Sequence, residues 1–220
     1  MSAEPRLPVA VFTRAPRPGR VKTRLIPAVG AEGAAALQRA FLTDTLARLG
    51  SVPELEPAVW AASEEDAGEL TGSLSLAVRA QPPGDLGERM CAALEEGIGR
   101  AGWAAVIGSD APTLPASLLG AARRALEHAE LVLGPAHDGG YYLIAARGRA
   151  PRLGPSIRWS TRHALADTLA AARETRVALL APWYDVDTPE DLRLLAAHLA
   201  RRPRAAPETA RTLDTLRPQF

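Results

Sequence analysis

Short apolar runs alternate with stretches of helical periodicity along most of the chain, and this alternation restricts the fold more than any other feature. Residues 8–13 and 103–107 are the clearest apolar runs, of the kind that fills a strand buried on both faces. Strands that alternate with helices favour a mostly parallel sheet that is covered by helices on both faces. We therefore predict an α/β fold with three layers, α/β/α, around a mostly parallel central sheet.

The same patterns give the expected elements by residue number. The chain shows no internal repeat and no second-domain boundary, so residues 1–200 are expected to form a single domain. Residues 201–220 are rich in Arg, Pro and Thr and are expected to form a loosely docked C-terminal tail. Strands are predicted at 8–13, 58–62, 74–78, 103–107, 131–133, 141–145 and 177–180, and helices at 32–49, 85–100, 116–129, 161–173 and 189–199.

Composition argues against several classes of protein. The 26 Lys and Arg residues nearly balance the 25 Asp and Glu residues, so binding to a nucleic acid polymer is not expected. Cys91 is the single cysteine, which excludes an internal disulfide and a cysteine metal cluster. No apolar run reaches the roughly 18–20 residues of a membrane span, and the N-terminus lacks the pattern of a secretion signal. We expect a cytoplasmic protein with no membrane partner.

A cation-rich loop, residues 14–24, follows the first predicted strand. Ligands of open parallel sheets bind beyond the carboxyl ends of the strands, where this loop lies. Lys22 and Arg24 bring two cations to one place, which suits a polyphosphate, and Arg14 adds to the positive potential. Gly19 would let the backbone approach a ligand closely. The loop matches neither a Walker loop nor a dinucleotide-binding loop, and its alternative interpretation is a solvated basic loop.

Two acidic segments follow predicted strands in the same way. Asp110 comes directly after the strand at 103–107, and Asp185 and Asp187 lie between the strand at 177–180 and the last helix. Carboxylates that converge from separate strand ends form an oxygen-only site of the type that Mg²⁺ uses with substrate phosphates. Asp110 and Asp187 are therefore metal candidates, although Asp187 could instead cap the last helix.

A glycine-rich segment between two predicted strands is a further candidate. Two glycines, Gly139 and Gly140, would permit close approach of a ligand, and Asp138 could hold a substrate hydroxyl or a second metal. Tyr141 follows directly. The alternative interpretation is a plain tight turn.

Two predicted helices begin near polar residues. Gln81 and Asp85 precede the helix at 85–100, whose N-terminal N–H groups could bind an anion, but Asp85 could equally cap that helix. Trp159 and Ser160 precede the helix at 161–173, and an N-cap role is favoured for Ser160.

Six motifs in this order resemble a known family. They lie at residues 16–25, 81–90, 108–114, 134–143, 159–161 and 185–192. Together they resemble the bacterial glycosyltransferase-like proteins named "transferase 1, rSAM/selenodomain-associated", which have the nucleotide-diphospho-sugar transferase (GT-A) fold. More distantly, the segments around Lys22, Asp110 and Asp187 are similar to 2-phospho-L-lactate guanylyltransferase and molybdenum-cofactor guanylyltransferases. The Pro-rich loop departs from the Gly-rich base-reading loop of those enzymes.

The resemblance implies roles for the candidate residues. Lys22, Arg24 and Asp110 would be catalytic, and Asp110 and Asp187 would hold Mg²⁺, with Mn²⁺ as an alternative. The nucleotide and its phosphates would contact Arg14, Gly19, Lys22, Thr23, Arg24, Gln81 and Asp85. The acceptor or sugar pocket would include Asp138, Gly139, Gly140, Tyr141, Trp159 and Ser160.

Three functions remain open from the sequence. The cation pair on the first loop favours nucleotidylyl transfer from a nucleoside triphosphate to a small phosphorylated or acidic acceptor, because the pair would lie where pyrophosphate leaves. The family resemblance favours transfer of a sugar from a nucleotide-diphospho-sugar donor. The third function is a non-catalytic nucleotide-binding module, which would require the acidic residues to be helix caps only.

Overall fold

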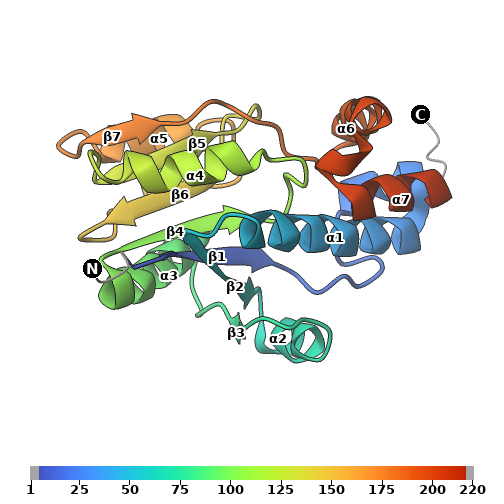
Figure 1. Cartoon of the computed structure of the whole chain (residues 1–220), viewed down its shortest axis with the longest axis horizontal. Helices are drawn as coiled ribbons and strands as arrows, with labels where there is room; N and C mark the ends of the chain where they lie inside the picture. The colour runs from blue at the N-terminus through green and yellow to red at the C-terminus, as the bar shows by residue number, and fades with distance from the viewer. Residues whose placement is uncertain (1–4, 217–220) are drawn as a thin grey trace.

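The computed structural model describes residues 5–216, and within this range a seven-stranded sheet lies between two layers of helices (Figure 1). The strand order is β3-β2-β1-β4-β6-β5-β7, and β6 is the antiparallel member. The predicted three-layer fold with a mostly parallel sheet is therefore confirmed. The strands are β1 (Leu7–Thr13), β2 (Leu55–Ala61), β3 (Val78–Ala80), β4 (Trp103–Gly108), β5 (Leu131–Pro135), β6 (Tyr141–Arg147) and β7 (Val177–Leu179).

The helices divide between the two faces of the sheet. One apolar cluster joins the sheet to α1, α2 and α4, and a second joins the opposite face to α3 and α5. Among residues 5–216, no helix combines the length and hydrophobicity that crossing a bilayer requires. The helices are α1 (Ile26–Gly50), α2 (Glu64–Thr71), α3 (Leu86–Ala101), α4 (Ala116–Ala125), α5 (Ala164–Ala171), α6 (Pro189–Arg201) and α7 (Pro207–Leu216), with short 3₁₀ helices at Thr23–Leu25 and Pro203–Ala205.

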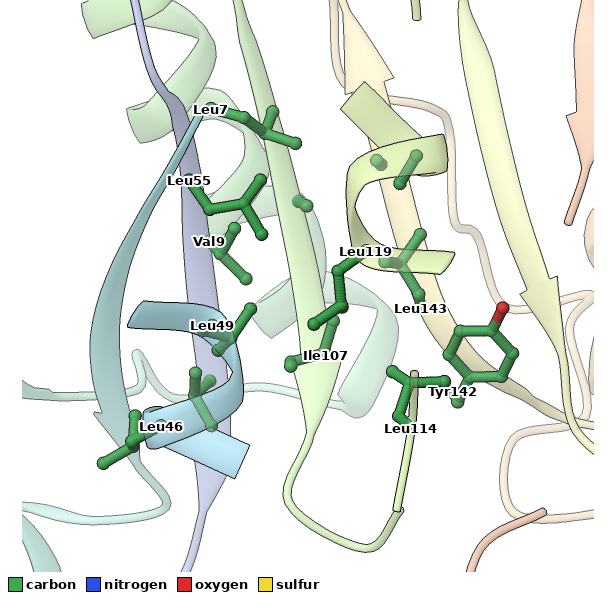
Figure 2. Close-up of a cluster of buried hydrophobic side chains, with 14 of the residues drawn as sticks. Leu7, Val9, Leu46, Leu49, Leu55, Ile107, Leu114, Leu119, Tyr142 and Leu143 are labelled. Carbon is green, nitrogen blue, oxygen red and sulfur yellow. The ribbon is translucent and has the colours of Figure 1, made fainter. Parts of the chain in front are cut away.

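The first apolar cluster fixes the position of β1 and β4, which lead into the candidate site. Figure 2 shows Leu49 of α1 facing Val9 of β1 and Ile107 of β4, and Leu46 of α1 belongs to the same cluster. Leu119 of α4 covers the same face. Each fully buried aliphatic side chain contributes about 1.5–3 kcal/mol relative to exposure, so this cluster holds the two strand ends in fixed positions.

One predicted strand is misplaced. Residues 74–77 precede the short edge strand β3, which begins at Val78, and helix α2 occupies residues that had no predicted element. The side chain of Ser63 accepts a hydrogen bond from the backbone N–H of Asp66, and acidic residues fill the first turn of α2. Capping and favourable charge at the N-terminus stabilise this short helix, whose apolar periodicity is weak.

The expected loose tail is also wrong for its described part. Helix α7 packs against α1 and α6, as Figure 1 shows, and Leu213 joins a buried cluster with Leu37 and Phe41 of α1. The buried carboxylate of Asp44 accepts hydrogen bonds from the backbone N–H groups of Glu208 and Thr209, at 3.1 and 2.8 Å, and from the Thr209 hydroxyl. Asp44 therefore caps a helix 164 residues away. Residues 217–220 of the predicted tail lie outside the described part of the chain.

Removal of this cap should weaken the attachment of α7. Asp44→Ala leaves buried N–H groups at the start of α7 without an acceptor, and we expect the free energy of unfolding to fall by about 1–3 kcal/mol. Chemical denaturation followed by circular dichroism measures this change. Thr43→Ala, at an exposed neighbouring position on α1, is the control and should change stability by less than about 0.5 kcal/mol. Equal stability of both variants would contradict the capping role.

Candidate active site

A cavity of about 850 Å³ opens at the carboxyl ends of four neighbouring parallel strands. Thr13 ends β1, Ala62 and Gln81 directly follow β2 and β3, and Ser109 directly follows β4. The cavity thus opens at the edge of the sheet where the sequence predicts a site. Of the predicted residues, Arg14, Lys22, Thr23, Arg24, Gln81, Asp110, Asp138, Ser160 and Asp187 line the cavity, whereas Gly19, Asp85, Gly139, Gly140, Tyr141 and Trp159 do not.

The side chain of Lys22 lies between the two acidic segments. Its Nζ is 2.6 Å from Oδ1 of Asp110 and 2.8 Å from Oδ1 of Asp187, and it donates a hydrogen bond to the carbonyl oxygen of Val186 at 2.7 Å. Burial alone would lower the pKa of Lys22, but the two carboxylates reverse this effect and raise it above its ordinary value. The group is therefore a charged ammonium at neutral pH.

The structure corrects the expectation that Lys22 and Arg24 lie together on a phosphate. Lys22 has a left-handed backbone, with φ of 45°, and its side chain turns to the carboxylates. Within the described part of the chain, Arg14 and Arg24 have no carboxylate partner. Arg17 instead binds Glu65, Asp66 and Glu69 around α2. Of the arginines that line the cavity, Arg20 pairs with Glu65 at 3.8 Å and Arg89 donates to backbone carbonyl oxygens. Arg14 and Arg24 are the cavity arginines whose guanidinium groups have no side-chain or backbone partner in the described chain.

Gly19 serves the loop rather than a ligand. Its φ is 75°, in the region that favours glycine, and it lies outside the cavity. The expected close approach of a ligand at this residue is therefore not supported, because the glycine is required by the turn itself.

The cap alternative for Asp187 is wrong. Thr188 caps α6: its side chain accepts a hydrogen bond from the backbone N–H of Asp191, which closes a capping box. The Asp187 carboxylate is consequently left for the cavity. Burial, together with the charge of Asp138, raises the pKa of the neighbouring Asp185 to about 7. The backbone N–H of Val186 donates to the carbonyl oxygen of Asp110 at 2.9 Å, so the two acidic segments are joined directly.

A buried polar group beneath the cavity was missed from the sequence. The side-chain amide of Gln38 donates to the hydroxyls of Thr13 and Ser109, at 3.0 and 3.1 Å. All three side chains are buried, and the two hydroxyls end β1 and begin the Asp110 turn. The available signal was a glutamine on the apolar face of α1, beside Leu37 and Phe41. This group fixes Asp110 relative to the cation-rich loop.

The other end of the cavity is formed by the segment before α3. Gln81 donates to the carbonyl oxygen of Trp60, and Arg89 donates to that of Gly84. Asp85 lies outside the cavity and caps α3 in a capping box with Glu88. For Asp85, the cap is therefore the interpretation that the structure supports.

Tyr141 and Trp159, expected in the acceptor pocket, lie in the apolar core on the opposite face. Their rings form an edge-to-face pair with centroids 6.5 Å apart, and burial raises the pKa of Tyr141. Trp159 packs so closely on Gly87 that an added Cβ there would lie 2.7 Å from its ring. Successive residues of a strand point to opposite faces, and this places Tyr141 away from the cavity.

Ser160 lines the cavity, but the predicted N-cap role is wrong. Its φ is 58°, and α5 begins only at Ala164. Lys22 and Ser160 are the non-glycine residues with positive φ in the described chain, and both lie at the cavity. Strained backbone conformations persist where surrounding structure imposes them, and they often occur at functional sites.

Asp138, Gly139 and Gly140 form a tight turn, as in the alternative interpretation. The Asp138 carboxylate accepts a hydrogen bond from the backbone N–H of Gly140 at 2.8 Å, and the side chain remains exposed at the cavity. Gly139 has φ of 88° and packs against the carbonyl oxygen of Arg162. The close approach that this glycine permits is therefore to the loop before α5, not to a ligand.

The residues around the Lys22 ammonium fit a divalent cation. Two carboxylate oxygens and a carbonyl oxygen converge on one position, and a positive charge already stands there. Mg²⁺ and Mn²⁺ prefer such oxygen ligands. Two carboxylates contact this ammonium, and within residues 5–216 no group of three or more His, Cys, Asp or Glu side chains is placed to hold a metal. The remaining ligands of a bound cation would therefore come from water or substrate.

Comparisons with known proteins agree with this fold. The family described as "Uncharacterized protein conserved in bacteria (DUF2064)" matches residues 45–161. A candidate nucleotide-diphospho-sugar transferase from Desulfovibrio desulfuricans G20 is 32% identical over 95% of each chain, with a TM-score of 0.86. No curated protein is significantly similar in sequence.

More distant solved structures share the fold alone. Molybdopterin-guanine dinucleotide biosynthesis protein A from Archaeoglobus fulgidus has a TM-score of 0.59 and 14% identity over 89% of this chain and 100% of that one. The 4-diphosphocytidyl-2C-methyl-D-erythritol synthase from Anaerococcus prevotii DSM 20548 has a TM-score of 0.58 and 14% identity, over 89% and 97% of the two chains.

The packing of Gly139 can be tested with a matched pair of glycines. Gly139 and Gly148 both have positive φ, but an added Cβ overlaps backbone only at Gly139. Gly148→Ala should cost about 1–2 kcal/mol from backbone strain. Gly139→Ala should cost a further 1–3 kcal/mol or so, because the overlap must be relieved. Thermal unfolding measures both, and equal costs would show that the turn does not pack on the loop before α5.

Proposed function

We propose a function for this chain from two premises: it belongs to the DUF2064 family of proteins conserved in bacteria, and its cavity joins unpaired arginines to two carboxylates. The proposed activity is a Mg²⁺-dependent transferase reaction on a nucleotide-activated donor. It transfers a nucleotidylyl group from a nucleoside triphosphate to a small phosphorylated or acidic acceptor and releases pyrophosphate. Membership in the narrower rSAM/selenodomain-associated group is part of the same proposal.

The observation that carries the proposal is the placement of Arg14 and Arg24. Both line the cavity, and neither has a carboxylate partner among the described residues. Charge-assisted hydrogen bonds to a phosphate are each worth about 1.5–3 kcal/mol, so the two side chains would bind a triphosphate and neutralise the leaving pyrophosphate. Preorganised charge of this kind is the main catalytic contribution that such a reaction needs.

The two ends of the cavity suggest an orientation for the substrates. Phe12, Gln81 and Arg89 would border the nucleoside, since Gln81 and Arg89 are held by backbone carbonyl groups and Phe12 stacks on Trp60. Asp138 and Ser160 lie beyond Asp110 and would border the acceptor. An acceptor held between them would be positioned for attack at the α-phosphorus.

Asp110 and Asp187 would hold Mg²⁺ or Mn²⁺, and the metal when bound would neutralise charge on the phosphates. Gln38, through Ser109, would keep Asp110 in position. Lys22, which also lines the cavity, would add a further positive charge near the phosphates.

Sugar transfer from a nucleotide-diphospho-sugar is a second candidate reaction, and one solved structure supports it. The Desulfovibrio desulfuricans protein is described as a candidate nucleotide-diphospho-sugar transferase, and it is similar to this chain over nearly its full length. In that reaction, an acceptor attacks the sugar carbon and a nucleoside diphosphate leaves. Arg14 and Arg24 would then neutralise the diphosphate.

The leaving group distinguishes the two reactions. We expect the protein to release pyrophosphate when it is incubated with Mg²⁺, one of the four nucleoside triphosphates and a panel of phosphorylated acids. A coupled phosphate assay with pyrophosphatase measures this product. A parallel incubation with nucleotide-diphospho-sugars serves as the comparison. If nucleoside diphosphate is released from those donors and no pyrophosphate is released from triphosphates, the reaction is sugar transfer and the proposal of nucleotidylyl transfer is wrong.

Removal of an unpaired arginine should slow the reaction. Arg24→Gln should lower kcat by about 10²–10³, as loss of one charge-stabilising donor typically does. Arg173→Gln removes the same charge from an exposed position outside the cavity and should leave kcat unchanged. Steady-state rates of the two variants give the comparison. Near-normal turnover of Arg24→Gln would contradict a role in phosphate binding and would favour the alternative interpretation, a solvated basic loop.

A further inference from the structure

The ammonium group of Lys22 is enclosed by oxygen atoms, whereas its partners face the cavity. Its three N–H donors match three acceptors: Oδ1 of Asp110, Oδ1 of Asp187 and the carbonyl oxygen of Val186. The Lys22 side chain is 5% exposed, but the side chains of Asp110 and Asp187 are 43% and 47% exposed. A second cation that enters from the cavity can therefore reach the carboxylates, while Lys22 lies behind them.

The amino-acid composition independently indicates that position 22 requires a lysine rather than an arginine. The chain has 26 Lys and Arg residues, and Lys22 is its only lysine. At every other position that needs a cation, the chain uses arginine. A planar guanidinium presents its donors as a fixed fork, whereas an ammonium is a compact point charge that directs three donors from one atom. The converging oxygens require that compact charge, which a divalent metal ion also has.

Lys22 and a divalent cation would compete for the same oxygens. Metal ions bind carboxylate oxygens at about 2.0–2.6 Å, and Nζ already uses one oxygen of each carboxylate. Two positive charges that share these oxygens would also repel each other strongly in a partly buried site. Stable metal binding therefore needs the lysine to leave. Displacing a buried ammonium is costly unless another acceptor is available, so a high metal concentration is needed when no phosphate is present.

We propose that Lys22 occupies the cation position when no nucleotide is bound, and that a divalent metal displaces it onto the phosphate that arrives with the metal. The inference rests on the proposed function for the identity of that phosphate. Free metal then binds weakly, and a metal–phosphate complex binds well because the phosphate accepts the displaced ammonium. Arg24, two residues further along the loop, lies at the same cavity and would meet the same phosphate.

The affinity for Mn²⁺ alone tests the competition. Electron paramagnetic resonance of free Mn²⁺ gives Kd for the wild type, Lys22→Met and Arg24→Met. We expect Lys22→Met to bind Mn²⁺ at least about 10-fold more tightly than the wild type. Arg24→Met removes one charge from the same cavity without freeing a carboxylate, and should change Kd by less than about 3-fold. Unchanged affinity of Lys22→Met, or equal tightening by Arg24→Met, would overturn the competition.

The double variant Lys22→Met/Asp110→Asn tests whether the carboxylate pair binds the Mn²⁺ that Lys22→Met binds more tightly than the wild type. Loss of the tighter Mn²⁺ site in this variant supports the carboxylate pair as its ligands. Retention of tight binding would show that the metal lies elsewhere and would overturn the inference. None of these measurements depends on turnover, so the absence of transfer activity would refute the proposed function while the Mn²⁺ affinities still decide the competition.

The wild-type protein provides a second test that needs no substitution in the site. Because Lys22 is the only lysine, an acylating reagent for amines can modify no other side-chain amine, and the α-amino group is an internal reference. We expect slow acylation of Lys22 in the protein alone, at least about 5-fold faster acylation with saturating Mg²⁺, and slow acylation again when inorganic pyrophosphate is added. Mass spectrometry of the peptide that contains Lys22 measures each rate.

Each result of the acylation experiment bears on one step. A rate that saturating Mg²⁺ does not change would overturn displacement of the lysine by the metal. A rate that stays high after pyrophosphate is added would overturn transfer of the ammonium onto phosphate. The three expected rates together would support both steps.

Discussion

The contact of one buried ammonium with two carboxylates is the interaction on which the site depends. Lys22 joins the loop after β1 to the Asp110 turn and to the segment before α6, which are 88 and about 164 residues away. A buried charge is expensive unless it is fully paired, so loss of any of these contacts would leave the ammonium incompletely paired and destabilise the site. The contact therefore joins three walls of the cavity and occupies Lys22, while Arg14 and Arg24 remain without a partner at the same cavity.

The sheet topology explains why these segments meet. Parallel strands place their following loops at one edge, and β1, β2, β3 and β4 all end there. The antiparallel β6 begins at the same edge, because the turn that contains Asp138 connects it to β5. The turn between β5 and the antiparallel β6 therefore lies at the same edge of the sheet as the loops that follow the parallel strands. The apolar clusters around β1 and β4 give the strand ends their rigidity (Figure 2).

Much of the fold could be predicted from the sequence, because local patterns of apolar residues carry the information for β1, α3, β4 and α6. The failures have different causes. The short α2 depends on a local cap at Ser63 rather than on apolar periodicity, whereas α7 depends on Asp44, which lies far away in sequence. One failure at the site comes from the direction of a side chain on its strand. Tyr141 follows a glycine-rich turn, as a pocket residue could, but strand alternation directs it into the core.

The sequence by itself determined the mostly parallel sheet, the edge at which the cavity opens and the carboxylates that follow its strands, since chain order and apolar periodicity decide these features. Only the tertiary structure decided which cation pairs with which acid. Lys22 and Arg24 are equivalent in local pattern, yet one is buried between Asp110 and Asp187 and the other is left open to the cavity. The physical reason is that pairing of charges depends on distances between segments far apart in sequence, and those distances exist only after the core has packed.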